Sequence, residues 1–422
     1  MTLSAFGEVR HDDGSAQVSS DGTLSYQAVF ADPAAWRLWT AATVSYLGDF
    51  VGLGALLLAA YDRSGGHALG AAAVFGIQAV PAFAVSAGIG PWLDLIPRRG
   101  GMTVLSLLGA GAVSLPIFAP GLWPVLVAAA MVGGIRTAFN SIRTGAIADA
   151  VPRDIRGRLI ALVSVSNQAS EVLGYLVGST VALIIGTGSA LGADAATFVV
   201  AAVLLAGLRL PEPTRSRDRA SMTTGIRTIF GDRTLAALVP VVWIGLALGA
   251  VPQTLATTLS RTDRAWVPAA LAAMAAGQAI AATVVGKTRL SERVHGEFCY
   301  LAVCGAAFML TAAGLSADRV LVVAGNFAIG LGFGWAVAVQ TTFVHVIPAD
   351  RMAHVTSTMI GSVIVLEGAG AVAFGAAAGA FGVAAAYLLA GALLTAAGLA
   401  GAGYGRAHPH ILDIRRLHPG QP

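Results

Sequence analysis

The sequence GPWLDLIPRR, from Gly90 to Arg99, is a short polar break between two long apolar runs. Besides its Gly-Pro pair it carries one carboxylate, Asp94, and two consecutive arginines, Arg98 and Arg99. Glycine lets backbones approach closely and proline fixes an angle, so the stretch suits a tight turn in which Asp94 accepts hydrogen bonds from the arginines or from a helix N-terminus. We interpret it as a charged loop joining two membrane helices; the alternative is a merely solvated turn.

The chain as a whole has the composition of a membrane protein. Of its 422 residues, 56% are hydrophobic and only 11% are charged, whereas a soluble protein of this size exposes far more charge. Apolar runs of about 20 residues, the length that crosses a bilayer, recur along the sequence. The net charge of +4 is therefore no sign of nucleic-acid binding.

The apolar runs form two groups of six. They lie at 36–60, 69–93, 101–120, 123–148, 158–187 and 189–209, and then at 234–259, 265–287, 297–316, 320–346, 353–378 and 381–403. We predict an all-α integral membrane protein with twelve transmembrane helices. Its expected parts are a flexible cytoplasmic tail (1–34), an N-terminal six-helix bundle (35–209), a cytoplasmic linker (210–233), a C-terminal six-helix bundle (234–404) and a second cytoplasmic tail (405–422).

The basic residues predict the orientation in the membrane. When the loops are assigned alternately to the two sides, most arginines fall on the side of the two termini. The exceptions on the other side are Arg63, Arg261, Arg264 and Arg319. Because cytoplasmic loops carry an excess of Lys and Arg, we expect both termini in the cytoplasm.

The two halves show an internal repeat at an offset of 196 residues. The matched pairs are Gly90 and Gly286, Pro152 and Pro348, Asp154 and Asp350, Glu171 and Glu367, and Gly174 and Gly370. Parallel repeats of this kind relate the two halves of some transporters. The second copy of the polar loop, 286–293, has Leu290 where the first has Asp94.

Several stretches resemble the major facilitator superfamily. The spacing G-x-x-x-D-x-x-x-R-R in 90–99 is similar to the superfamily's signature loop between its second and third helices. YLGDF (46–50), ADAVPRDIRGRLIALVSVSNQ (148–168) and ADAATF (193–198) resemble the macrolide-efflux and siderophore-exporter-like branch of drug:proton antiporters. The resemblance implies two pseudo-symmetric six-helix bundles, alternating access, and a gate motif made of Gly90, Asp94, Arg98 and Arg99. The Gly-Pro that such antiporters often carry in the fifth helix is absent from GYLVGS (174–179).

A set of polar residues at bilayer depth provides the candidates for proton coupling or substrate binding. These are Asp49, Arg136, Asn140, Arg143, Glu171 and Glu367. Ionisable residues inside a membrane are costly and mark functional sites by default. The spacing of Arg136, Asn140 and Arg143 puts them on one helix face, and a neighbouring face carrying Glu171 implies charge neutralisation between the two helices.

Each candidate also has a structural interpretation. The arginines brace the bundle, the glutamates lock the two bundles together, and Asp49 forms hydrogen bonds between close glycines. Asp194 is expected to cap the N-terminus of its helix. Further polar residues that bind substrate or join helices are Gln78, Gln253, Gln278, Asn326 and Gln340, and Trp243 is one of the aromatic residues suited to an apolar pocket.

No motif of an enzyme is present: the sequence has no P-loop, nucleophile elbow or HExxH, so we expect neither catalysis nor ATP as the energy source. The two cysteines form no metal-ligand pattern, and we expect no metal and no cofactor. We predict a bacterial inner-membrane secondary transporter that exports a small amphipathic molecule by proton-coupled antiport. Its expected partners are that substrate, protons and the lipid bilayer, with no nucleic acid, and the chain is expected to be a monomer. The alternatives are uptake of a small metabolite and a non-transporting scaffold or sensor.

Overall fold

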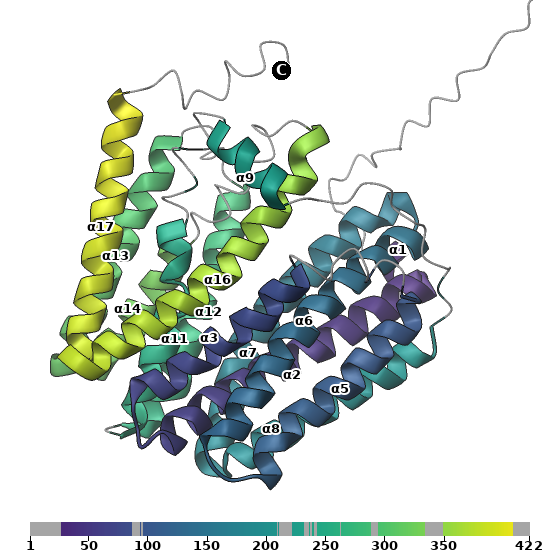
Figure 1. Ribbon diagram of the computed structural model, residues 1–422, viewed down its shortest axis with the longest axis horizontal. Helices are drawn as coiled ribbons and strands as arrows, with labels where there is room; N and C mark the ends of the chain where they lie inside the picture. Colours follow the sequence, from purple (N-terminus) through teal and green to yellow (C-terminus); the bar gives the residue numbers. More distant parts are fainter. Residues whose placement is uncertain are drawn as a thin grey trace, which may run out of the picture.

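The computed structural model describes residues 27–86, 93, 96–208, 210, 222–231, 236, 239, 243–261, 263–287, 294–333 and 349–407. Throughout these residues the regular structure is helical, and no strand occurs in them. Figure 1 shows two bundles of long helices that lie side by side. The all-α class predicted from hydropathy is confirmed.

The first bundle is built around one long helix. After a short α1 (Gln27–Ala31), its helices are α2 (Pro33–Arg63), α3 (Ala68–Ala84), α5 (Arg98–Phe118), α6 (Leu122–Ala150), α7 (Arg153–Ile184) and α8 (Thr187–Ala206). α2 contacts α3, α6, α7 and α8 and is largely buried among them. Its start is set by Asp32, whose side chain accepts a hydrogen bond of 2.7 Å from the backbone N–H of Ala35.

The second bundle repeats this arrangement with a broken first helix. An apolar helical stretch, Trp243–Leu259, contains α11 (Val251–Ala256) and most of η2 (Thr257–Arg261). It is followed by η3 (Arg264–Trp266), α12 (Val267–Lys287), α13 (Val294–Ala317), α14 (Arg319–Gly332), α16 (Ala349–Phe381) and α17 (Val383–Ala407). α13 packs against both α14 and α17, and α12 packs against α14.

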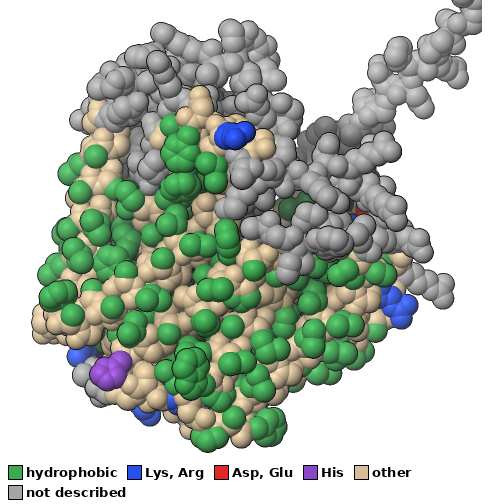
Figure 2. Space-filling model, in the orientation of Figure 1, with side chains coloured by type: hydrophobic (Ala, Val, Ile, Leu, Met, Phe, Trp, Pro, Cys, Tyr) green, Lys and Arg blue, Asp and Glu red, His purple; other side chains and the backbone are tan. Residues whose placement is uncertain are grey.

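The length and surface of these helices suit a bilayer. In the described residues, 8 helices are long and apolar enough to cross a membrane, and the four shorter apolar helices are Ala68–Ala84, Trp243–Leu259, Leu301–Ala317 and Arg319–Gly332. Large apolar side chains such as Phe118 and Trp123, 84% and 77% exposed, point outward. Figure 2 shows a broad hydrophobic face with the Lys and Arg atoms near its margins. Because such a surface is stable only against lipid, the chain is a multi-pass membrane protein.

The two bundles meet along two helix pairs, α3 with α16 and α7 with α12. Small residues bring the first pair close together. A Cβ added at Gly368 would lie 2.7 Å from the Cβ of Ala79, and one at Gly375 would lie 2.5 Å from the Cβ of Ala72. Close backbone approach at small residues is the usual way in which membrane helices associate.

The two ends of the molecule are packed differently. At the end opposite the termini, one apolar core joins both bundles, with Leu56 of α2 and Leu259 and Leu271 of the second half. At the end of the termini, a core that includes Leu38 and Ile142 draws all its residues from the first half. Figure 1 shows the bundles diverging toward the side where α2 begins and α17 ends. We call these the closed end and the open end.

Part of the predicted linker, 210–233, is helical. α9 (Met222–Gly231) packs against α16, and Ile229 is fully buried in the core of the second bundle. The polar composition of the linker hides three apolar residues at helical spacing, Ile226, Ile229 and Phe230; Ile229 is the one that is buried, and the other two remain exposed. The predicted tail 1–34 is helical from Gln27, and residues 1–26 and 408–422 lie outside the described part.

Candidate functional site

A polar cavity of about 360 Å³ lies between the two bundles. Four of the residues selected from the sequence line it: Arg136 and Asn140 of α6, Glu171 of α7 and Glu367 of α16. Each of these lies near the middle of its helix, so the cavity sits near the midplane of the expected bilayer. Gln78 and Gln253 also line it, together with aromatic side chains that include Phe50 and Phe75. The structure therefore brings together residues from both halves that are far apart in sequence.

The two glutamates occupy equivalent places in the two halves. One helical turn after Glu171, Gly174 packs against the backbone of α2, where an added Cβ would lie 3.1 Å from the backbone oxygen of Leu47. One turn after Glu367, Gly370 packs in the same way against the backbone of Ala247, in the first helix of the second half. The internal repeat thus places one carboxylate from each bundle at the same cavity.

Arg136 lies at the boundary between this cavity and the interior of the first bundle. Its Nε is 3.9 Å from Oδ2 of Asp49, which makes a charge contact but is too long for a hydrogen bond. Its guanidinium carbon lies 5.3 Å from the centre of the Phe50 ring, within the range of a cation–π contact. The side chain of Arg136 is 35% exposed, whereas that of Asp49 is only 6% exposed.

Asp49 and Arg143 line a separate void inside the first bundle. The void is about 10 Å³, the size of one water molecule, and Arg136 and Asn140 also line it. The guanidinium of Arg143 lies 5.0 Å from the centre of the Tyr46 ring, and its Nε and Nη1 have no hydrogen-bond partner within the described structure. The predicted common face of Arg136, Asn140 and Arg143 is confirmed, because all three line this void.

Asp194 is not a helix cap, contrary to the prediction. α8 begins at Thr187 after Gly186, whose φ of 119° ends the preceding turn, so Asp194 lies two turns inside the helix. It is 2% exposed, and its carboxyl group rests against Gly48 and Gly52 of α2. The cap prediction was wrong because the apolar sequence before Asp194, from Thr187 on, already belongs to the helix.

Half of the predicted gate motif can be located. Gly90 and Asp94 lie outside the described residues, while Arg98 is buried and Arg99 is exposed. The Nε of Arg98 donates a hydrogen bond of 3.2 Å to Oδ2 of Asp149 on α6. The sequence analysis did not select Asp149. Gly145, one helical turn before Asp149, could have indicated this contact, because the absence of a side chain there makes room for the guanidinium of Arg98.

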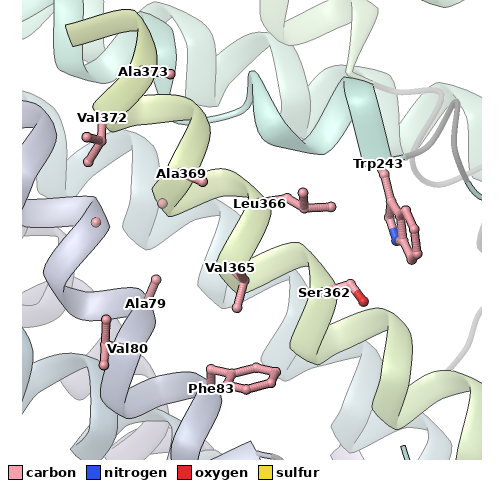
Figure 3. A pocket seen from close by; sticks show the side chains of 12 residues that line it. Ala79, Val80, Phe83, Trp243, Ser362, Val365, Leu366, Ala369, Val372 and Ala373 are labelled. Carbon is pink, nitrogen blue, oxygen red and sulfur yellow. The ribbon is translucent and has the colours of Figure 1, made fainter. Parts of the chain in front are cut away.

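An apolar groove of about 860 Å³ lies beside the cavity, on the outer surface between α3 and α16. Figure 3 shows its side chains, which include Val80 and Phe83 of α3, Val365 of α16 and Trp243. Ser362 carries the one polar side chain among the lining residues, apart from the indole N–H of Trp243. Ala79 and Gly368 line both the groove and the cavity, so a single layer of small residues separates them.

Two six-helix bundles around a polar cavity define a carrier that spans the membrane. The model of the Major Facilitator Superfamily matches residues 38–364, and the chain belongs to this family. It is therefore a transporter of the major facilitator type. No curated protein matches the sequence.

Solved transporters share the fold at low identity. A peptide transporter, POT, in complex with sulfate is 14% identical, with a TM-score of 0.70 over 94% of this chain and 100% of that one. The nucleoside transporter NupG is 12% identical, with a TM-score of 0.68 over 87% and 97%. A bacterial homologue of the human lysosomal transporter Spinster, in an inward-facing and unoccupied conformation, is 15% identical, with a TM-score of 0.63 over 90% and 98%. The efflux branch suggested by the sequence motifs stays a prediction.

Proposed function

We propose that this protein exports a small amphipathic molecule across the bacterial inner membrane in exchange for protons. The observation that carries the proposal is the cavity between the bundles, which Arg136 lines together with Glu171 and Glu367 while its Nε faces the buried Asp49. Glu171 and Glu367 are then placed to contact a substrate, and all three carboxyl groups are placed to bind protons.

The balance of charge supports proton exchange. At the cavity and its boundary, the carboxyl groups of Asp49, Glu171 and Glu367 face two guanidinium groups, those of Arg136 and Arg143, so one negative charge remains in excess. Unbalanced negative charge at bilayer depth is costly, so protons or a cationic substrate must neutralise the excess. A substrate cation and protons that compete for the same carboxylates exclude one another, which is the requirement for antiport.

The neighbouring groove supports an amphipathic substrate. Ala79 of α3 and Gly368 of α16 lie between the polar cavity and the apolar groove. We call this line of contact between α3 and α16 the α3–α16 seam. A molecule with a charged head and a hydrocarbon tail finds a matching surface on each side of this seam. Entry of such a molecule from the lipid phase requires only that the seam between the bundles open.

The packing of the two ends supports alternating access. The closed end joins the bundles through a shared apolar core, and across it Arg264 lies 3.7 Å from Asp62. We propose that the open end faces the cytoplasm, where the excess of arginines is expected, and that both termini lie there. The gate motif (Gly90, Asp94, Arg98, Arg99) would latch this end when it closes, with Arg98 anchored on Asp149.

The domain boundaries belong to the same proposal. Bundles at 35–209 and 234–404, joined by the linker 210–233, would move as two rigid bodies within a monomer. Size-exclusion chromatography with light scattering tests the monomer, and a stable dimer in detergent would contradict it.

Transport in reconstituted vesicles tests the function. The probe is ethidium, a fluorescent lipophilic cation, and an imposed proton gradient supplies the energy. We expect accumulation by the wild type and its loss in Asp49→Asn, Glu171→Gln and Glu367→Gln. Asp318→Asn, which removes an exposed carboxylate and keeps a side chain able to cap α14, is the matched control.

Each alternative function predicts a different outcome. Unchanged transport in all three carboxyl variants would refute the coupling residues. Accumulation only when the gradient favours inward movement would replace export by uptake. No movement of ethidium or of any compound in a panel of growth inhibitors would favour the non-transporting scaffold or sensor.

A further inference from the structure

Asp194 is an acidic side chain buried inside the first bundle, away from the central cavity. It is 2% exposed, and its Oδ1 has no hydrogen-bond partner in the described part of the chain. The hydroxyl of Thr197 donates 2.7 Å to the backbone oxygen of Asp194. A buried carboxylate with one oxygen unpaired and no cation beside it in the described residues is unfavourable, so this group requires a bound proton or another cation.

α2 is shaped to receive this carboxyl group. A Cβ at Gly48 would lie 2.8 Å from Oδ1 of Asp194, and a Cβ at Gly52 would overlap Oδ2. The two glycines are four residues apart and therefore share a face of α2. Any larger residue at either position would displace Asp194.

Asp49 lies between these two glycines in the sequence and faces the same region. Its side chain is 6% exposed, and its Oδ1 also has no hydrogen-bond partner in the described structure. The carboxyl group of Asp194 packs on Gly48, the chain neighbour of Asp49, and on Gly52, so the two acidic side chains lie at adjoining parts of α2 and repel each other electrostatically. Two carboxylates that share a buried site cannot both carry their charge.

The surrounding charges decide which of the two groups is neutral. Arg136 of α6 lies 3.9 Å from Oδ2 of Asp49, and Arg143 of the same helix stacks on Tyr46 nearby. α5 contributes the uncharged Ser106 to this region, and Glu171 of α7 lies on the cavity side of Arg136. In the described residues no ion pair reaches Asp194, so Asp49 is the charged member while Arg136 stays beside it.

A route connects this pair to the central cavity. The void of about 10 Å³ touches Asp49, and two of its other walls, Arg136 and Asn140, also line the cavity. The void has room for one water molecule, which would contact Asp49 together with Arg136 and Asn140. Asp194 does not line this void, so a proton reaches it by way of Asp49. The proton moves between water and a carboxyl oxygen, and no other bond changes.

We propose that Asp49 and Asp194 form one buried proton-binding site, reached from the cavity through this void. The pair holds one proton in the observed conformation, on Asp194, and binds a second when Arg136 moves away from Asp49. Its role in coupling rests on the proposed function, whereas the protonation itself does not. Asp194 is thereby separated from the substrate, which Glu171 and Glu367 contact.

Infrared spectroscopy of the purified protein tests the protonation without any substrate. The background is Glu171→Gln/Glu367→Gln, which removes the cavity glutamates from the spectrum. At neutral pH we expect a band of a protonated carboxyl group in this background and its loss in Asp194→Asn. The control Asp62→Asn should leave the band unchanged, because that side chain is half exposed to solvent.

The stability of the variants checks that the loss is not caused by misfolding. Because Asn replaces a neutral carboxyl group by a neutral group of the same shape, Asp194→Asn should unfold at the wild-type temperature. A band that survives Asp194→Asn would overturn the proposal. So would a band that disappears when sodium is added at constant pH, because the site would then bind a metal cation.

Transport of ethidium tests the coupling role separately. Asp194→Asn should lose gradient-driven accumulation and keep the exchange of ethidium between the two sides without a gradient. Full accumulation, or loss of exchange in a folded variant, would overturn the coupling role of Asp194. If the wild type moves no ethidium, the proposed function fails while the infrared result still decides the proton site.

Discussion

The seam between the two bundles provides a test with a matched control in a single helix. Gly368 and Gly379 both lie in α16, but only Gly368 faces α3. A Cβ at Gly368 would lie 2.7 Å from the Cβ of Ala79 and 3.1 Å from the backbone oxygen of Phe75, whereas Gly379 has nothing within 4 Å. The substitution Gly368→Ala therefore wedges the seam, and Gly379→Ala leaves it untouched.

The expected magnitude follows from these distances. Ordinary van der Waals contact begins near 3.4 Å, so α3 and α16 must separate by about 0.7 Å at Gly368. Overpacking of this kind destabilises the packed arrangement by about 1–3 kcal/mol. Replacing glycine by alanine also reduces the conformational entropy of the unfolded chain, which stabilises the folded state of both variants by about 0.4–1 kcal/mol. Relative to Gly379→Ala, Gly368→Ala should disfavour the observed conformation by about 1–3 kcal/mol, which is about 5–150-fold in population.

Distances between the open ends of the bundles report this shift. Spin labels at two exposed positions, Thr144 of α6 and Ile226 of α9, are attached in a background without the native cysteines. Gly368→Ala should shift the distribution of distances between the labels toward values shorter than those of the observed, separated arrangement. Gly379→Ala should give the same distribution as the labelled protein without either substitution. Identical distributions and unfolding temperatures in the two variants would refute the idea that the α3–α16 seam sets the opening.

Three further predictions concern the groove, the closed end and the glycines beside Asp194. Ala369→Trp should reduce the transport rate of long-chain alkyltrimethylammonium ions more than that of short-chain ones, by up to about fourfold for each methylene of the tail that no longer fits in the groove. Ala376→Trp, at an exposed position of the same helix, should not show this dependence on chain length. An equal reduction for all chain lengths would exclude binding of the tail in the groove. Arg264→Ala should lower the free energy of unfolding by no more than about 1 kcal/mol, because the ion pair between Arg264 and Asp62 is about half exposed to solvent. Thermal melts at two salt concentrations measure this change, and a larger loss would show that the pair holds the closed end together. Gly52→Ala should lower the melting temperature relative to Gly192→Ala, which has open space around it, and equal melting would contradict the packing of Asp194 on α2.

The fold could be predicted because its signals are local. Each apolar run is long enough to cross a bilayer, and a chain with twelve such runs has few ways to arrange them. The connector 210–233 shows the limit of the method. Its average polarity predicts a loop, whereas a few apolar residues at helical spacing allow α9 to dock on α16. Only the neighbouring helix reveals that this short face has somewhere to bind.

The site could be predicted only as far as a single helix extends. Spacing placed Arg136, Asn140 and Arg143 on one face, and all three line the void beside Asp49. It did not reveal that Asp149 pairs with Arg98, or that Asp194 rests on α2, because those contacts join residues separated by 50 to 150 positions. Such partners depend on which helices become neighbours, and hydropathy does not encode that choice.

The internal repeat explains why the two groups of carboxylates should have different tasks. Glu171 and Glu367 are repeat partners, so each bundle contributes one of them to the cavity. The cluster inside the first bundle has no such partner: the repeat places Gly245, Gly332 and Ala390 at the positions of Asp49, Arg136 and Asp194.

These three counterparts are small and buried, and an added Cβ at Gly332 would lie 2.7 Å from the Cβ of Cys304, so the second bundle is tightly packed where the first is polar. Duplicated carboxylates at the interface change their surroundings when the bundles tilt, as a substrate site must. An unduplicated cluster inside one rigid bundle keeps its geometry throughout the cycle, as a proton store must. On this reasoning, motion of Arg136 at the boundary between them is the event that links substrate release to proton binding.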